Sequence, residues 1–295
     1  MNVVESHDLG RRYGATWALQ ECSLTIPAGH LTALVGPNGA GKTTLLNLVM
    51  GLSTPSAGEL TVLGGLRPGS LPALDGIGFV AQDTPVYRGF SVGDMVHLTR
   101  SLNRSFDSAF AHRRLGDLGI DQRKRAGQLS GGQRAQLALT LALARHPRLL
   151  VLDEPTAALD PLARHDFMAT VMAAMADDGV SVVLSSHLLA ELERVTDHLV
   201  LMCGGRVRLD GPVEDLLAAH RFVTTRSGPA SSSPRWEVVE SSVAGAQTHQ
   251  LVRLDSPESG PPTGCDARAV GVEELAMAYL RTGSEAVPVL EGALR

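Results

Sequence analysis

The sequence predicts an α/β fold in which helices alternate with the strands of a largely parallel sheet. An apolar run at 31–35 leads into a glycine-rich loop and then into a helix-forming stretch. Apolar runs at 149–152 and 180–184 are short and end in polar residues, which is typical of parallel strands buried on both faces. Polar side chains that follow such strands gather at one edge of the sheet, where open α/β sheets bind ligands.

Length and composition indicate a globular protein with one large domain, or with a large domain and a small companion. The chain has 295 residues, of which 44% are hydrophobic, 19% charged and 4% aromatic. The formal net charge of −5 gives no electrostatic reason to bind nucleic acid. Cys22, Cys203 and Cys265 lie far apart and lack metal-ligand spacing, so we expect neither disulfides nor a zinc site, and a reducing cytoplasm fits best.

From the sequence we expect no signal peptide and no membrane span. The first residues lack a basic segment followed by an apolar one. No stretch approaches the roughly eighteen consecutive apolar residues that a membrane helix needs. If the protein acts at a membrane, we expect another subunit to supply the membrane part.

The first thirty residues predict a small antiparallel sheet. Apolar positions alternate over 18–26, after a predicted turn at 10–14 and before a proline and glycine break at 27–29. Tyr13 falls in that turn. It would stack on an adenine ring, or it is a surface tyrosine at the sheet edge.

Residues 36–43 read G-P-N-G-A-G-K-T and match the P-loop pattern. The glycines let successive backbone N–H groups turn toward phosphate oxygens, with the positive end of the next helix behind them. Lys42 would reach the β- and γ-phosphates, and the Thr43 hydroxyl would bind Mg²⁺. The alternative is a glycine-rich turn that binds nothing. The residues expected to bind nucleotide here are Gly36, Pro37, Asn38, Gly39, Ala40, Gly41, Lys42, Thr43 and Thr44.

The segment after the P-loop helix predicts two strands and an inserted helical lobe. Apolar and polar residues alternate over 58–63, as in a strand, and glycines and prolines interrupt regular structure over 64–72. Residues 76–81 are a candidate for a buried strand. This strand delivers Gln82 to the ligand edge of the sheet, although a plain loop residue is the alternative. Apolar residues then recur at helical spacing over 91–122, within a lobe expected at about 86–145.

A second glycine-rich turn, L-S-G-G-Q at 129–133, opens a helix expected over 134–144. Two glycines and a serine at a helix N-terminus form an anion-binding arrangement. The residues concerned are Ser130, Gly131, Gly132 and Gln133. An ordinary turn and helix cap is the alternative.

Three polar side chains are expected at the ends of buried strands. Asp153 and Glu154 follow the run at 149–152, so Asp153 would hold Mg²⁺ and Glu154 would polarise the attacking water. His187 ends the next strand, within reach of a γ-phosphate, although a lone histidine is more often structural. An amphipathic helix is expected over 188–195, and a hairpin over 198–209.

The compact part is expected to end at 222. A linker is predicted at 223–235, followed by a small α+β unit at 236–282 and a tail at 283–295. The strand candidates are 236–239 and 250–254, and 272–281 is helical.

In their order and spacing, these motifs closely resemble the nucleotide-binding domain of the ABC (ATP-binding cassette) superfamily over residues 1–222. The motifs are the P-loop, L-S-G-G-Q, L-L-V-L-D-E-P at 149–155, A-L-D at 158–160 and His187. The resemblance implies a P-loop NTPase (RecA-like) core with an N-terminal antiparallel β subdomain, an inserted helical subdomain and a C-terminal α+β appendage. It also implies ATP and Mg²⁺ as ligands.

The resemblance assigns roles to individual residues. Tyr13 would stack on adenine, Gln82 would sense Mg²⁺ and the lytic water, and His187 would contact the γ-phosphate. Two copies would dock head to tail, so that Ser130, Gly132 and Gln133 of one close over ATP on the P-loop of the other. Asp160 would cross that interface. The catalytic set is Lys42, Gln82, Glu154 and His187, and the metal set is Thr43, Gln82 and Asp153.

Weaker similarities indicate a subgroup of exporters. V-E-E-L at 272–275, F-D at 106–107 and the segment 185–193 resemble ATP subunits of drug, antibiotic, lipid or polysaccharide exporters. We therefore expect an ATPase subunit on the cytoplasmic face of the membrane that drives a separate polytopic permease. We expect a homodimer rather than a heterodimer, and no nucleic-acid partner.

Two other functions are considered. A soluble ABC-type ATPase acting on ribosomes or DNA is disfavoured by the single P-loop, the lack of sustained heptads and the acidic balance. A stand-alone P-loop kinase or GTPase is disfavoured by L-S-G-G-Q.

Overall fold

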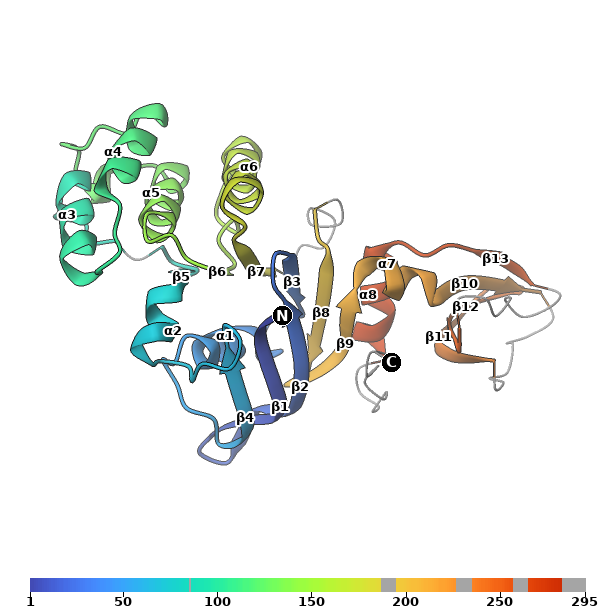
Figure 1. Cartoon of the computed structure of the whole chain (residues 1–295). Coiled ribbons are helices and arrows are strands. Elements are labelled where there is room, and N and C mark those ends of the chain that lie inside the picture. Colours follow the sequence, from blue (N-terminus) through green and yellow to red (C-terminus); the bar gives the residue numbers. More distant parts are fainter. Residues whose placement is uncertain (85, 187–194, 227–234, 257–264, 283–295) are drawn as a thin grey trace.

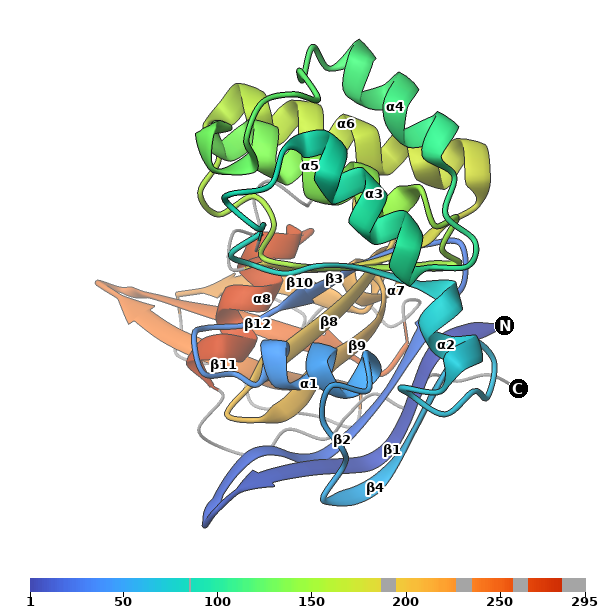
Figure 2. The ribbon, with the colours of Figure 1, turned by 90° about the vertical axis from the view of Figure 1, so that its left-hand side faces the viewer.

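The computed structural model describes every residue except 85, 187–194, 227–234, 257–264 and 283–295. Three sheets organise the described part of the chain, and a helical lobe lies over the central one (Figures 1 and 2). Their strand orders are β2-β1-β4, β5-β6-β7-β3-β8-β9 and β11-β12-β10-β13.

The central sheet confirms the predicted α/β core. Its first five strands are parallel and β9 is antiparallel to β8. Every residue of β3 and β6 is buried, because helices cover one face and α1 with the N-terminal sheet covers the other. The strands are β3 (Leu31–Val35), β5 (Ile77–Val80), β6 (Leu149–Asp153), β7 (Ser181–Ser186), β8 (His198–Cys203) and β9 (Arg206–Pro212), and the helix is α1 (Lys42–Val49).

The N-terminal sheet is antiparallel, as predicted, but its first turn lies later in the chain. It consists of β1 (Asn2–Tyr13), β2 (Thr16–Pro27) and β4 (Ala57–Val62). The predicted turn at 10–14 is wrong for residues 10–13, which continue β1. The pairing register between β1 and β2 is irregular from Leu9 to Arg12, where β1 contains a glycine and two arginines. The Arg12 guanidinium lies over the Trp17 ring, 5.6 Å from the ring centre.

A short helix, α2 (Leu71–Gly76), lies where the sequence predicted a segment interrupted by glycine and proline and then the start of a strand. The strand β5 begins at Ile77, one residue later than predicted. The helix is difficult to recognise in the sequence because Ala73 is its only buried residue.

The helical lobe has its own apolar core, which includes Val92, Leu115 and Leu137. Helix α5 begins at Gly131, three residues before its predicted start, because Ser130 caps it. The helices are α3 (Val92–Leu102), α4 (Ser108–Asp117), η1 (Ala126–Gln128) and α5 (Gly131–Leu143), and α6 (Pro161–Asp178) packs beside α5.

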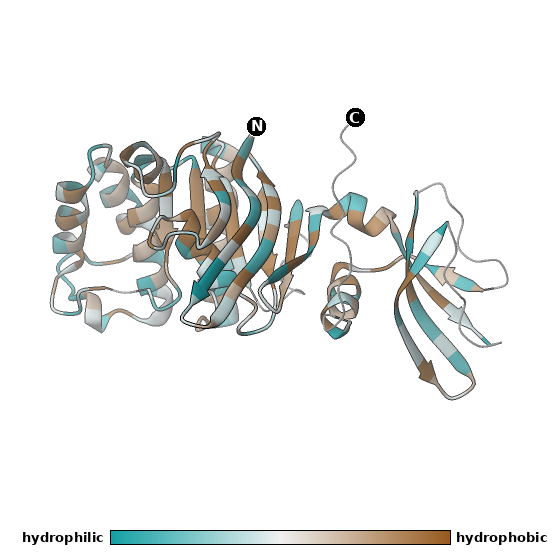
Figure 3. Ribbon diagram, turned by 90° about the horizontal axis from the view of Figure 1, so that it is seen from below, coloured by the Kyte–Doolittle hydropathy of each residue, from teal (hydrophilic) through white to brown (hydrophobic). Residues whose placement is uncertain are grey.

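The C-terminal part is an antiparallel sheet with two helices, and it lies on the far side of the central sheet from the helical lobe (Figure 3). The structure differs from the predicted linker at 223–235, because residues 223–225 belong to β10 and pair with β12 and β13. The elements are α7 (Val213–Ala218), β10 (His220–Thr225), β11 (Trp236–Ala244), β12 (Gln247–Leu254), β13 (Asp266–Arg268) and α8 (Val272–Arg281).

Strands β11 and β12 are longer than their predicted cores, whereas α8 has the predicted bounds. None of the helices in the described part of the chain combines the length and the hydrophobicity of a transmembrane segment.

Candidate nucleotide-binding site

A cavity of 520 Å³ lies where the P-loop leaves the carboxyl end of β3. It brings together segments that are far apart in the sequence, from the N-terminal sheet, the loop after β5 and the end of β6. Its lining residues are Tyr13, Ala18, Asn38, Gly39, Ala40, Gly41, Lys42, Thr43, Thr44, Gln82 and Glu154. The sequence predicted all of these except Ala18, whose small apolar side chain carries no recognisable signal.

The P-loop is packed tightly against the strands behind it, and this explains two of its glycines. A Cβ on Gly36 would lie 2.3 Å from the Met202 carbonyl oxygen of β8. Gly41 has φ +102° and precedes α1, and a Cβ there would lie 2.6 Å from Leu19 Cδ2 of β2. Any larger residue would push the loop away from the sheet, so the backbone could not keep its cradle shape.

The Lys42 side chain is buried, with only 5% of its surface exposed. Its Nζ donates to the Gly36 carbonyl at 2.7 Å and to the Pro37 carbonyl at 3.3 Å. The same Nζ lies 3.4 Å from Glu154 Oε1, and Glu154 is 12% exposed. The cavity therefore holds a positive charge on a glycine-rich loop, opposite a carboxylate that follows β6.

A serine on the neighbouring strand connects the two carboxylate residues. The Ser185 hydroxyl donates to Asp153 Oδ1 at 2.6 Å and accepts from the Glu154 backbone N–H at 2.8 Å. Asp153 and Ser185 are both buried, and Glu154 has φ +44°. Ser185 was not among the residues predicted from the sequence. The available signal was a polar residue near the end of a strand that is otherwise buried and mostly apolar.

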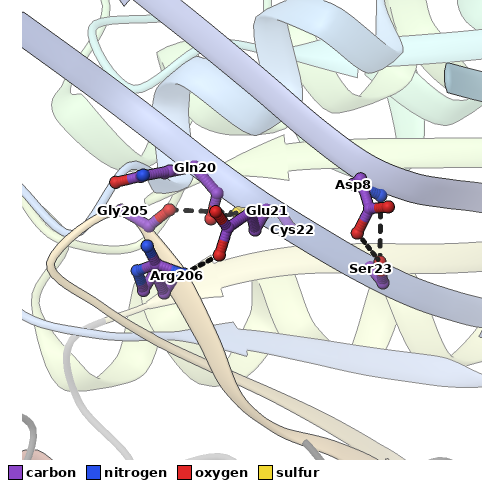
Figure 4. Close-up of polar contacts among 7 residues, drawn as sticks. All are labelled: Asp8, Gln20, Glu21, Cys22, Ser23, Gly205 and Arg206. Atoms are coloured by element: carbon purple, nitrogen blue, oxygen red, sulfur yellow. Dashed lines mark hydrogen bonds and ion pairs between the residues drawn. The ribbon is translucent and has the colours of Figure 1, made fainter. Parts of the chain in front are cut away.

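The turn between β8 and β9 contacts β2 (Figure 4), and it also supports the P-loop. Gly205 N donates to the Ala40 carbonyl at 3.2 Å, and the Gly205 carbonyl accepts from Cys22 Sγ at 3.0 Å. Burial raises the pKa of the Cys22 thiol. Arg206, the first residue of β9, forms an ion pair with Glu21 of β2. These contacts join the loop, β2 and the hairpin into one unit.

Tyr13 and Gln82 both reach the cavity. Tyr13 is the last residue of β1, is 49% exposed, and has the Arg11 guanidinium 4.7 Å from its ring centre. A hydrogen bond from Arg11 lowers the pKa of the Tyr13 hydroxyl. Gln82 follows β5 and is exposed.

The L-S-G-G-Q residues lie outside this cavity. Ser130 caps α5: its Oγ accepts from Gln133 N at 3.2 Å, and Gln133 Oε1 accepts from Ser130 N at 3.2 Å. A Cβ on Gly132 would lie 2.9 Å from Ala163 Cβ of α6. Asp160 caps α6 by accepting from Ala163 N at 2.9 Å. The two helix starts therefore form a common surface, separate from the P-loop cavity of the same chain.

His187 and residues 188–194 of the predicted amphipathic helix lie outside the described residues. The role of His187 stays a prediction.

The residues at the cavity suit a triphosphate with magnesium. The loop offers backbone N–H groups and a buried ammonium, which bind anions. Thr43 and Gln82 line the cavity, whereas the buried Asp153 is not among its lining residues. All three side chains offer oxygen ligands, and Mg²⁺ prefers oxygen, commonly taking one or two carboxylates together with substrate phosphates. Within the described residues, no cluster of three or more histidine, cysteine, aspartate or glutamate side chains could hold a metal by itself.

Comparison with known proteins agrees with this geometry. A family model described as ABC transporter matches residues 19–157. Nod factor export ATP-binding protein I of Cupriavidus pinatubonensis is 36% identical over 224 residues, which are 73% of this chain and 68% of that protein. The Fe(3+) ions import ATP-binding protein FbpC of Serratia marcescens is 34% identical over 223 residues, covering 73% of this chain and 65% of that protein.

A solved structure shows the same fold. The cbiO1 protein of Clostridium perfringens, part of the ABC transporter complex cbiONQ, superposes with a TM-score of 0.64 at 27% identity. The match covers 74% of this chain and 91% of that one. The fold prediction is therefore confirmed for the P-loop core. This chain belongs to the ABC transporter family as an ATP-binding subunit, an ATPase that uses ATP and Mg²⁺.

Proposed function

We propose that the chain hydrolyses ATP at the P-loop cavity as one of two identical cassettes, and that it drives export through a separate membrane permease. The observation that carries the proposal is the approach of Lys42 and Glu154 to 3.4 Å across one cavity. A phosphate-binding cation and a carboxylate able to orient water are the two groups that this chemistry needs at one place.

Different residues of the cavity bind the nucleotide and accept the proton of the attacking water. The loop N–H groups and the Lys42 ammonium bind the phosphates and stabilise charge on the transferred group. Glu154 orients the attacking water and accepts its proton. Asp153, Thr43 and Gln82 would hold Mg²⁺, which when bound neutralises charge on the phosphate oxygens. Tyr13 offers an aromatic face for the adenine.

We propose a homodimer because one chain carries both halves of a composite site. The P-loop cavity contains none of Ser130, Gly131, Gly132, Gln133 and Asp160, and all five are at least partly accessible. A second copy placed head to tail can offer this surface to the first copy's ATP. The reciprocal contact then forms a second site, so that two identical chains close over two nucleotides.

A permease would contact the side of the chain beyond Gln82. A cavity of 280 Å³ lies there between β5, α3 and α5, with Phe79, Met95 and Leu141 among its lining residues. Tyr87 and Phe90 nearby are 63% and 41% exposed. Exposed aromatics beside a partly apolar hollow are typical of an interaction site. The cbiO1 protein, which is part of a transporter complex, supports the same kind of assembly.

The direction of transport is proposed as export. Support comes from the similarity to the Nod factor export protein and from the exporter-like C-terminal helix at 272–281. The similarity to an iron import protein is the reason for a direct test. Cells carrying wild type or Glu154→Gln are compared by mass spectrometry of the medium and of the cell contents. A solute that wild type enriches outside, and the variant inside, supports export; the opposite distribution refutes it.

Copurification tests the coupling to a membrane protein. The chain is expressed with an affinity tag from its own chromosomal locus, and membranes are extracted with mild detergent. We expect a polytopic membrane protein to copurify at a fixed ratio. Recovery of ribosomal RNA or DNA without such a protein would refute the transporter reading and favour the soluble alternative, which the transporter relatives do not support.

A further inference from the structure

Ser185 lies at the centre of the proposed catalytic edge, although no nucleotide-binding motif includes it. It is fully buried on β7, where it pairs with Asp153 of β6 on one side and with Leu34 of β3 on the other. We propose that Ser185 is a positioning residue for ATP hydrolysis. Its hydroxyl orients the Asp153 carboxylate toward Mg²⁺ and holds the Glu154 backbone in the conformation that directs this side chain into the cavity. This inference rests on the proposed function.

The first contact acts on the metal-binding carboxylate. Ser185 donates to Asp153 Oδ1 at 2.6 Å, and in the described part of the chain this is the only hydrogen bond of the Asp153 side chain. A buried carboxylate is costly unless a hydrogen-bond donor satisfies it, and such a donor also fixes its orientation. A neutral hydroxyl satisfies one oxygen without cancelling the charge. The other oxygen keeps a defined direction and its attraction for a cation.

The second contact acts on the proposed general base. Glu154 has φ +44°, a left-handed conformation that residues with a Cβ rarely adopt and that costs free energy. Its backbone N–H donates to the Ser185 hydroxyl at 2.8 Å, which stabilises this conformation. In the same conformation the Glu154 carboxylate lies 3.4 Å from Lys42 Nζ.

One hydroxyl therefore uses its donor on Asp153 and an acceptor lone pair on Glu154. The orientation of the two carboxylates is coupled through it. Removal of the hydroxyl frees both at once, so metal affinity and turnover should fall together.

A second serine on the same strand offers a matched control. Ser181 is also buried, and its hydroxyl accepts the Gly29 backbone N–H at 2.8 Å, but it contacts neither carboxylate. Ser185→Ala and Ser181→Ala each remove one buried hydroxyl that accepts a backbone hydrogen bond. We expect both to lower the urea midpoint, measured without nucleotide, and Ser185→Ala to lower it more because it also removes the donor to the buried Asp153 carboxylate.

The distinguishing measurements concern the metal. We expect Ser185→Ala to raise the Mg²⁺ concentration for half-maximal ATP hydrolysis about tenfold and to lower kcat by about tenfold or more. Binding of Mn²⁺ with ATP, followed by electron paramagnetic resonance in the Glu154→Gln background, should weaken by a similar factor. Ser181→Ala should leave the Mg²⁺ dependence, kcat and Mn²⁺ binding at their wild-type values. Equal metal dependence of the two variants would overturn the proposal.

A second variant keeps the test decisive if Ser185→Ala fails to fold. Ser185→Cys keeps the side-chain size but offers only a weak S–H donor. It should shift the Mg²⁺ dependence in the same direction by a smaller factor, and an unchanged dependence would overturn the proposal. Wild type without ATPase activity would refute the proposed function itself, whereas active wild type with indifferent Ser185 variants would refute this inference alone.

Discussion

Two oppositely charged residues at the cavity, Lys42 and Glu154, have different proposed roles. Lys42 is held on the P-loop by two backbone carbonyls, and Glu154 is its acidic neighbour. An arriving triphosphate offers the ammonium new anionic partners, which leaves Glu154 to orient water. Binding and turnover should therefore respond differently to the loss of each residue.

Lys42→Ala should weaken ATP binding by about ten- to a hundredfold, because charge-assisted hydrogen bonds to the phosphates are lost. Glu154→Gln should leave binding within about twofold but lower ATP turnover by about a hundredfold or more, because an amide cannot accept the proton. Calorimetry gives the affinities, and phosphate release gives the rates. Equal hydrolysis by wild type and Glu154→Gln would remove Glu154 from the mechanism.

Glu154→Gln should also accumulate a closed dimer with ATP and Mg²⁺. Light scattering after size exclusion should show twice the monomer mass with ATP and the monomer mass without it. A variant that binds ATP but stays monomeric would refute the proposed homodimer.

Among the secondary-structure elements, two helices begin with the same local structure but are proposed to differ in function. Helices α3 and α5 both have a serine N-cap in a reciprocal capping box. Ser91 exchanges hydrogen bonds of 3.0 and 2.9 Å with Asp94, and Ser130 exchanges two of 3.2 Å with Gln133. The cap contributes stability in both helices, whereas the proposed contact with a second copy's ATP belongs to Ser130 alone.

Ser91→Ala and Ser130→Ala should each lower the free energy of unfolding by about 1 kcal/mol, measured by urea denaturation, because each loses its N-cap bond. ATP hydrolysis should fall only in Ser130→Ala. If both variants kept the wild-type rate, Ser130 would be a helix cap and nothing more.

On the scale of the whole molecule, a buried histidine joins the C-terminal sheet to its helices. His220 of β10 is fully buried, with Nδ1 2.6 Å from the Leu216 carbonyl of α7 and Nε2 2.9 Å from the Tyr279 hydroxyl of α8. Burial lowers the pKa of His220 to about 4 and raises the pKa of Tyr279 to about 12. Both groups are therefore neutral in the folded protein near neutral pH.

The stability of the C-terminal part should depend on pH through His220. Above pH 6.5 the histidine is neutral in both folded and unfolded chains, and its contribution is complete. As the pH falls from 6.5 toward 4, the unfolded chain binds a proton that the folded chain does not. The free energy of unfolding should decrease by up to about 1.4 kcal/mol per pH unit, or about 3 kcal/mol in total.

Urea titrations between pH 7 and 4, followed by Trp236 fluorescence in a Trp17→Phe background, measure this slope. His220→Gln should be less stable at pH 7 but should lose the His220 part of the slope. His165→Gln, at a site that is 80% exposed, should retain the wild-type slope. Parallel curves for wild type and His220→Gln would show that His220 does not control this stability.

Local chemistry along the chain was enough to predict the P-loop, the buried strands β6 and β7 and the bounds of α8. Glycine spacing, a lysine before a helix, and apolar runs ending in acids act over a few residues, so they can be read directly. The same patterns predicted Gln82 and Glu154 for the cavity, because parallel strands end at one edge. Short or irregular elements such as α2 and the end of β1 have weak local patterns, so they were not predicted from the sequence.

Only the tertiary structure decided which distant groups touch. The hydrogen bond between Ser185 and Asp153 joins residues 32 positions apart in the chain. The Gly205 N–H that donates to the P-loop comes from the turn between β8 and β9. Strand β10 joined the C-terminal sheet because β12 and β13 supplied its hydrogen-bond partners. The local sequence specifies which chemical groups are present. Packing decided which residues hold that chemistry in place, because a hydrogen bond between strands depends on their order and register in the sheet, and neither is written in the residues of one strand alone.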